Sequence, residues 1–247
     1  MTALAGYALQ LGDDALILSH RLSEWCAHGP ELEEDIALAN LALDLLGQAR
    51  TLLTYAGELE GAGRDEDCLA YLRTEREFRN LLLVEQDNGD FAKTIARQLY
   101  FATYQAGLYE ALRTSADPVL SGLADKAVKE VAYHRDHAIQ WTLRLGDGTE
   151  ESHRRMQDGL DALWPYTGEL FDEDALAAEL DGIAVDPRTL RADWEASVAA
   201  VVEQATLTMP GGTWQPKGGR TGAHGETFGF LLGEMQSLHR QYPGAKW

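Results

Sequence analysis

The sequence is poor in cysteine and in basic residues, and each shortage excludes a class of protein. Only two cysteines, Cys26 and Cys68, occur in 247 residues, so no disulfide framework can be built. Both lie in apolar helical patterns, and we interpret them as reduced, buried thiols of a cytoplasmic protein. The 21 lysines and arginines face 40 aspartates and glutamates, a formal net charge of −19. Such an acidic surface repels phosphate groups, which argues against nucleic acid and anionic membranes as partners.

Long hydrophobic runs and strand patterns are also missing. No stretch approaches the roughly 18 apolar residues of a membrane-spanning helix, and we expect no targeting segment at the start of the chain. No segment alternates apolar and polar residues for long enough to predict a sheet. The signatures of nucleotide-binding loops, dithiol pairs and serine hydrolases do not occur. We therefore expect an all-α protein without a membrane span.

What the sequence does contain is a series of amphipathic helices, because apolar residues recur at spacings of three and four over most of the chain. Two long helical hairpins are predicted, over about 4–61 with a turn at Gly29-Pro30 and over about 91–146 with a turn at Asp117-Pro118. Two such hairpins packed together form a four-helix bundle. No domain boundary is evident, so we predict a single domain over 1–247. Flanking helices are predicted at 65–85, 149–171, 187–207 and 224–240, with a long loop at 210–222.

The predicted helix over 31–61 carries one line of polar residues on an apolar background. Its middle, 36–46, is apolar nearly all round, which predicts burial on every side. Asn40, Asp44 and Gln48 are spaced four apart and would share one face. A buried carboxylate is costly unless it is paired, so Asp44 needs a partner. Candidates are Lys126, Glu130 and His134, which have the same spacing, and Asp13, His20 and Glu24 of the first helix.

Facing polar lines inside a four-helix bundle admit two interpretations. One is a di-iron or di-manganese site, which takes a glutamate from each of two helices and a Glu-x-x-His pair from each of the other two. The other is a hydrogen-bonded network that sets the register of the helices. The sequence contains one Glu-x-x-His frame, from Glu150 to His153, and it falls at the start of a helix rather than in the middle. The count therefore favours the structural network.

Several longer segments carry a resemblance to a known family. They are Leu11-Gly12-Asp13, Leu22-Ser23-Glu24-Trp25, Leu43 to Arg50, Leu81 to Gln86, Thr94 to Gln98, Lys129 to His134, Gly182 to Leu190, and Glu234-Met235-Gln236. Together they span essentially the whole chain, and they resemble the PaaC subunits of the bacterial phenylacetyl-CoA epoxidase, the ring-1,2-epoxidase of phenylacetate degradation.

The resemblance implies a ferritin-like fold without a working di-iron centre. A related catalytic subunit would hold the iron and oxidise the substrate. Where that chain would read Asp-Glu-Ala-Gly-His, this sequence has Leu45 in place of the glutamate and Gln48 in place of the histidine. Where it would read Glu-Ser-Phe-His, this sequence has Val131 in place of the glutamate. The expected remnant of the site, which would bind no metal, is Asp44, Gln48, Glu130 and His134.

The resemblance thus predicts a non-catalytic structural subunit of a phenylacetyl-CoA epoxidase, with no catalytic or cofactor-binding residue of its own. Its partner in a hetero-oligomer would be the catalytic di-iron subunit, and self-association is a further option. Candidate contact surfaces are the first hairpin and the loop at 210–222, with Trp214, Lys217 and Arg220.

Two alternatives remain open from the sequence. The first is a self-sufficient di-iron oxygenase with an atypical ligand set. It would use Asp44, Glu130 and His134 together with a carboxylate such as Asp13 or Glu24. The second is a module that binds an acyl-CoA in the space that a metal site would occupy, for which the sequence offers little basic surface.

Overall fold

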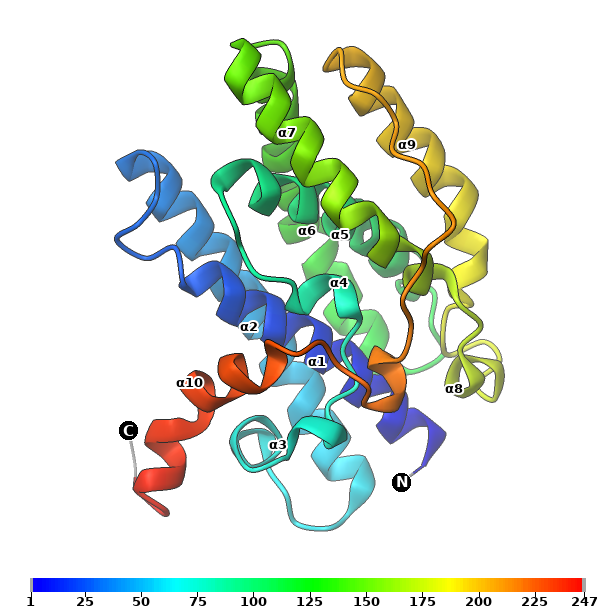
Figure 1. Cartoon of the computed structure of the whole chain (residues 1–247). Helices are drawn as coiled ribbons and strands as arrows, with labels where there is room; N and C mark the ends of the chain where they lie inside the picture. The colour runs from blue at the N-terminus through cyan, green and yellow to red at the C-terminus, as the bar shows by residue number, and fades with distance from the viewer. Residues whose placement is uncertain (1, 246–247) are drawn as a thin grey trace. The chain divides into compact units, whose positions relative to one another are not determined.

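A computed structural model describes residues 2–245, and these residues form helices and no strand (Figure 1). The all-α prediction is confirmed. The chain packs as two compact units, one made of Met1–Asp87 and Gly218–Trp247 and the other of Asn88–Lys217. The prediction of a single domain stays a prediction.

The first unit is built on the hairpin of α1 (Ala3–Ser23) and α2 (Leu32–Glu60), which lie side by side in Figure 1. The backbone N–H of Gly29 in the turn donates to Asp35 Oδ2 at 3.2 Å. A Cβ atom at position 29 would come within 2.8 Å of the Asp35 backbone, so only glycine fits there. Gly61 ends α2 in the left-handed conformation, with φ of 67°. The unit also contains α3 (Glu66–Tyr71), η1 (Glu75–Glu77), α4 (Leu82–Glu85), η4 (Gly219–Thr221) and α10 (Phe228–Gln241).

The second unit is built on the hairpin of α5 (Phe91–Leu112) and α6 (Pro118–Gly146). Asp90 caps α5 by accepting the N–H of Lys93, and Asp117 caps α6 at the predicted turn. Against α5 pack α7 (Glu150–Leu163), η2 (Trp164–Phe171), η3 (Pro187–Leu190) and α9 (Arg191–Gln204), with the short α8 (Ala175–Ala178) between η2 and η3 in the chain. A cluster of aromatic rings joins these elements, and it contains Tyr100, Trp164, Phe171 and Trp194.

The prediction of one helix over 65–85 is wrong. The chain there is broken into α3, η1 and α4, with an extended stretch around Phe78 to Leu81. The cause is tertiary, because the backbone N–H groups of Arg79 and Leu81 donate to the carboxylates of Asp13 and Asp14 in α1 instead of to a helix. Hydrogen bonds to ionised groups are stronger than the neutral helical ones that they replace.

Three other predicted helices are shorter in α-helical form than the sequence suggests. The helix over 149–171 turns into the 3₁₀ helix η2 at Pro165, which cannot donate a backbone hydrogen bond. The helix over 187–207 opens with the 3₁₀ turn η3, at Pro187. The last helix begins at Phe228 instead of His224, because His224 and Gly225 are hydrogen-bonded to Glu85.

The prediction that α2 is buried on every side is also wrong. Exposed fractions reach 73% for Leu32, 53% for Ile36, 62% for Leu43 and 43% for Leu46. The helix is long and apolar enough to cross a membrane by length and composition alone, and half of its most apolar window is buried within the structure. Core helices of proteins without a membrane span pass the same test.

The two cysteines are free, but they are less buried than the sequence suggests. Cys26 is exposed and Cys68 is half-buried. Cys26 lies beyond the end of α1, in the turn that leads to α2, where the helical pattern no longer places it in the core.

Candidate functional site

The predicted remnant site takes two of its residues from α2, in the first unit. Along the predicted polar line Asn40 is exposed, Asp44 is half-buried and Gln48 is 1% exposed, so the line runs from the surface inward. Leu45, at the position of the expected carboxylate ligand, is fully buried. Asp44 and Gln48 are both engaged in interactions.

The other two predicted residues lie on α6, in the second unit. Glu130 is largely buried and pairs with Lys126 Nζ at 3.3 Å, while the side chain of His134 is 1% exposed. Val131, at the second expected carboxylate position, is fully buried. That the lines on α2 and α6 meet stays a prediction.

Leu45 and Val131 do not supply the two carboxylates that a di-iron centre is expected to have at these positions. Two ferrous ions need anionic ligands to balance their charge, and positions 45 and 131 present apolar side chains to the interior. The single Glu-x-x-His frame also serves another purpose. His153 Nδ1 lies 2.7 Å from the carbonyl oxygen of Gly146 and ties α7 to the end of α6, and Glu150 is exposed in the first turn of α7.

Asp13, a candidate ligand from the sequence, is fully buried and committed to a structural ion pair. Both of its oxygens accept from the guanidinium of Arg73, and Oδ2 also accepts the N–H of Arg79 at 2.8 Å. Arg73 itself is 2% exposed and stacks over the ring of Phe78. Buried charges persist when they are paired and hydrogen-bonded, as here. The pair anchors the segment after α3 to α1.

Asp14 forms a second buried ion pair, which the sequence did not predict. Arg220 donates to its two oxygens at 3.0 and 2.7 Å, and the N–H of Leu81 donates to Oδ1 at 2.7 Å. Burial raises the pKa of the Asp14 carboxyl to about 6, against the lowering effect of Arg220. Two adjacent acidic residues in a strongly apolar helix were the available signal in the sequence. Arg220, predicted as a surface contact, instead fastens its segment to α1.

A third buried polar group in the first unit centres on Glu85. Its side chain accepts from Asn80 Nδ2 at 2.8 Å and from the N–H of Gly225 at 2.7 Å, and it lies 2.7 Å from His224 Nδ1. The other ring nitrogen of His224 faces the carbonyl oxygen of Phe78 at 3.2 Å. Both neighbours of the ring are hydrogen-bond acceptors. This cluster holds the chain before α10 against the segment before α4.

The loop at 210–222 is only partly free for a partner. Trp214 is 64% exposed and meets Tyr166 edge to face, whereas Lys217 Nζ pairs with Asp172 at 2.5 Å. Of the three predicted contact residues, Trp214 is therefore the one whose side chain stays exposed and available to a partner.

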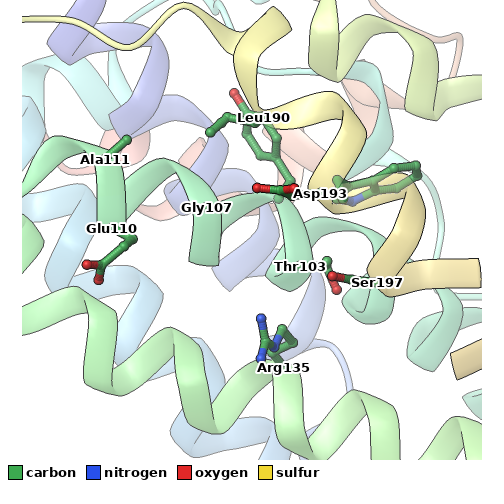
Figure 2. A pocket seen from close by; sticks show the side chains of 10 residues that line it. Thr103, Gly107, Glu110, Ala111, Arg135, Leu190, Asp193 and Ser197 are labelled. Carbon is green, nitrogen blue, oxygen red and sulfur yellow. The ribbon is translucent and has the colours of Figure 1, made fainter. Parts of the chain in front are cut away.

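A cavity of about 310 Å³ opens in the second unit, between α5, α6 and α9 (Figure 2). Glu110 of α5, Arg135 of α6 and Asp193 of α9 are its charged residues. One arginine against two carboxylates does not offer the positive field that the phosphates of a CoA require. The acyl-CoA interpretation gains no support from this cavity.

Comparison with known proteins decides the family. The model of the phenylacetic acid catabolic protein family matches residues 1–247. The chain is also 52% identical to the C subunit of the 1,2-phenylacetyl-CoA epoxidase of Escherichia coli (strain K12), over 249 residues that cover all of both chains. The chain belongs to the phenylacetic acid catabolic protein family. The resemblance seen in the sequence is thereby confirmed.

As a member of the phenylacetic acid catabolic protein family, the chain has a ferritin-like, all-α fold. This family fold explains why Leu45 and Val131 lie at buried helical positions. They occupy places that point inward from long helices, where an apolar side chain is stable and an unpaired carboxylate is not. By contrast, the ion pairs of Asp13 and Asp14 hold irregular segments against α1, and the Glu85 cluster holds two such segments together. No spacing motif in the sequence predicts these contacts.

Proposed function

We propose that this chain is the non-catalytic structural subunit of a phenylacetyl-CoA epoxidase and supports the iron-bearing catalytic subunit in aerobic phenylacetate catabolism. The full-length similarity to a protein named as part of that epoxidase supports the reaction and the assembly. The observation that carries the non-catalytic role is the complete burial of Leu45 and Val131 at the two expected carboxylate positions. We expect the subunit to act in the cytoplasm, where its two free cysteines stay reduced.

The surface that we propose for the catalytic subunit is the apolar stripe on α2, defined as Leu32, Ile36, Leu43 and Leu46. Steps of four, seven and three residues place all four side chains on one face of the helix. This is the spacing by which one helix packs along another. A subunit of a hetero-oligomer has a reason to expose such a stripe, because a partner covers it, and the catalytic subunit is the expected partner.

The charge around the stripe favours a protein over a membrane. The first turn of α2 contains Glu33, Glu34 and Asp35, and the whole chain carries a formal charge of −19. Anionic lipid headgroups repel such a surface, whereas a partner protein can present basic residues at the rim. Binding to a lipid surface is the alternative that the flotation measurement detects.

The first experiment measures the iron content of the isolated chain after expression in iron-supplemented medium. Less than about a tenth of an iron per chain agrees with the absence of two carboxylate ligands. Close to two irons per chain, together with oxygen-dependent turnover by the isolated chain, would replace this proposal with a self-sufficient oxygenase.

The second experiment tests the assembly by co-expression with the catalytic subunit. We expect a hetero-oligomer in size-exclusion chromatography with light scattering, and epoxidation of phenylacetyl-CoA only when both chains are present. Ile36→Glu and Leu43→Glu should weaken the complex at least about tenfold, because each buries a charge in an apolar contact.

Thr51→Glu is the matched control, since Thr51 is exposed on α2 but lies off the stripe. Equal weakening by all three variants would show that added charge, not the stripe, is responsible. Flotation of the wild-type chain with neutral vesicles, lost in Ile36→Glu, would identify a lipid surface as the occupant instead. A catalytic subunit that is soluble and fully active alone would overturn the structural role.

A further inference from the structure

A histidine and two glutamates meet in the first unit, away from the predicted remnant site. His20 and Glu24 lie one turn apart on α1, and Glu234 lies on α10. One ligand atom from each can be chosen so that all three atoms lie within 4.8 Å of one another. Among residues 2–245 this is the one such group of three or more histidine, cysteine, aspartate or glutamate side chains.

The imidazole of His20 supplies a second, independent observation. Its Nε2 atom is shielded from solvent and has no hydrogen-bond partner. Buried polar atoms in folded proteins nearly always have a partner, and an exception calls for an explanation such as an ion. Imidazole is a common ligand of transition metals, so an unpartnered ring nitrogen beside two carboxylates points to a cation.

The donor set matches a divalent transition-metal cation. One neutral imidazole and two carboxylates carry a charge of −2 together, which balances a divalent ion. Imidazole nitrogen with carboxylate oxygen suits Zn²⁺ and Mn²⁺, and three protein ligands leave room for water in the remaining positions. The spacing of four residues between His20 and Glu24 puts both on one face of α1.

The guanidinium of Arg21 would compete with a bound cation for the carboxylate of Glu24. Its Nη1 atom pairs with Glu24 Oε1 at 2.8 Å, and its Nε and Nη2 atoms donate to the carbonyl oxygen of Glu85. The bonds to Glu85 hold the guanidinium in place, so a bound cation would share the Glu24 carboxylate with Arg21. This sharing predicts moderate affinity for the cation.

We propose that His20, Glu24 and Glu234 form a binding site for a divalent transition-metal cation that joins α10 to α1. The site is structural, because it ties the last helix of the chain to the first. Its ligands include none of the four residues of the predicted remnant site, and the proposal holds whether or not the chain is an epoxidase subunit.

The test titrates Zn²⁺, and in parallel Mn²⁺, into the full chain after treatment with EDTA, with calorimetry as the readout. We expect one site per chain in the wild type. His20→Ala should abolish it. Glu234→Gln should weaken it at least about tenfold, because even the loss of a group that only hydrogen-bonds to a metal ligand costs that much. Glu234 is exposed, so its replacement by glutamine leaves the fold intact and keeps the test valid if His20→Ala fails to fold.

His28→Gln is the matched control, because His28 is an exposed histidine of the same unit outside the cluster. It should bind the metal as the wild type does. A second readout is limited proteolysis, in which Zn²⁺ should slow cleavage at α10 in the wild type and in His28→Gln but not in Glu234→Gln. No saturable binding, or equal binding by all variants, would overturn the proposal and show adventitious surface binding.

Discussion

Replacing Arg220 by alanine tests how much its ion pair with Asp14 stabilises the first unit. Its guanidinium donates to both oxygens of Asp14 and to the carbonyl oxygens of Gln10 and Arg79, while Asp14 is 3% exposed. In Arg220→Ala the Asp14 carboxyl keeps the backbone N–H of Leu81 as a donor but loses the guanidinium. A buried ionised carboxylate without its partner is strongly destabilising, so Asp14 should take up a proton instead.

The pKa of Asp14 makes this loss depend on pH. In the wild type the folded pKa is about 6 against an ordinary value of 3.8, so the folded state binds the proton more tightly than the unfolded state. The contribution of Asp14 to the free energy of unfolding of the wild type therefore falls as pH rises from about 4 to about 6, and it is constant above that range. Without Arg220 the folded pKa lies higher still, and the fall continues to higher pH at up to about 1.4 kcal/mol per pH unit.

The expected cost of Arg220→Ala follows from these two effects. At pH 5.5, where Asp14 is largely protonated in both proteins, lost hydrogen bonds should cost about 1–2 kcal/mol. At pH 8 the difference in protonation should bring the total to about 3–4 kcal/mol. Urea denaturation followed by circular dichroism at the two pH values measures both numbers.

Lys217→Ala is the control for this experiment. Lys217 also comes from the loop at 210–222 and pairs with Asp172, but both side chains are partly exposed, so its loss should cost less than about 1 kcal/mol at either pH. A cost for Arg220→Ala that is the same at pH 5.5 and pH 8 would refute the argument that Arg220 balances the Asp14 charge. A cost no larger than that of Lys217→Ala would refute the structural role of the pair itself.

Three further predictions concern the second unit, each measured by urea denaturation. Asp117→Ala should lower the free energy of unfolding by about 1–2 kcal/mol, because Asp117 Oδ1 accepts the first two N–H groups of α6. Asp186 caps only a short 3₁₀ turn, so a smaller loss for Asp117→Ala than for Asp186→Ala would contradict this prediction. Trp194→Phe should cost about 1–2 kcal/mol and change the near-ultraviolet circular dichroism, since it removes the bond from Nε1 to the Tyr100 carbonyl; an unchanged spectrum would argue against the ring cluster. Val131→Glu should lower the free energy of unfolding by at least about 3 kcal/mol at neutral pH, because it puts a carboxyl at a fully buried position. If added iron restored the stability of this variant, a metal site would have been rebuilt.

Helix content and several helix boundaries could be predicted from the sequence, because these depend on local chemistry. The predicted hairpins end and turn where expected, because Gly61 ends α2, α5 begins at Phe91 and Asp117 caps α6. The identity of the family also came from the sequence, since it rests on the residues themselves. The resemblance predicts that Leu45 and Val131 stand where a catalytic subunit would have carboxylates, and the structure shows that both side chains are buried.

Tertiary structure decided what local pattern could not. The segment 65–85 has helical periodicity, yet the carboxylates of Asp13 and Asp14 hold the backbone around Arg79 and Leu81 in an extended form. These partners lie 66 and 67 residues away in the chain, so the local sequence gives no sign of them. The apolar sequence in the middle of α2 does not indicate which faces of the helix pack against other helices. The fold leaves Ile36 and Leu43 exposed to solvent. His20 and Glu234 stand more than 200 positions apart in the chain, so their meeting depends on how α10 packs. Spacing along the chain determines which side chains share a helix face, but burial and long-range pairing are properties of the packed molecule.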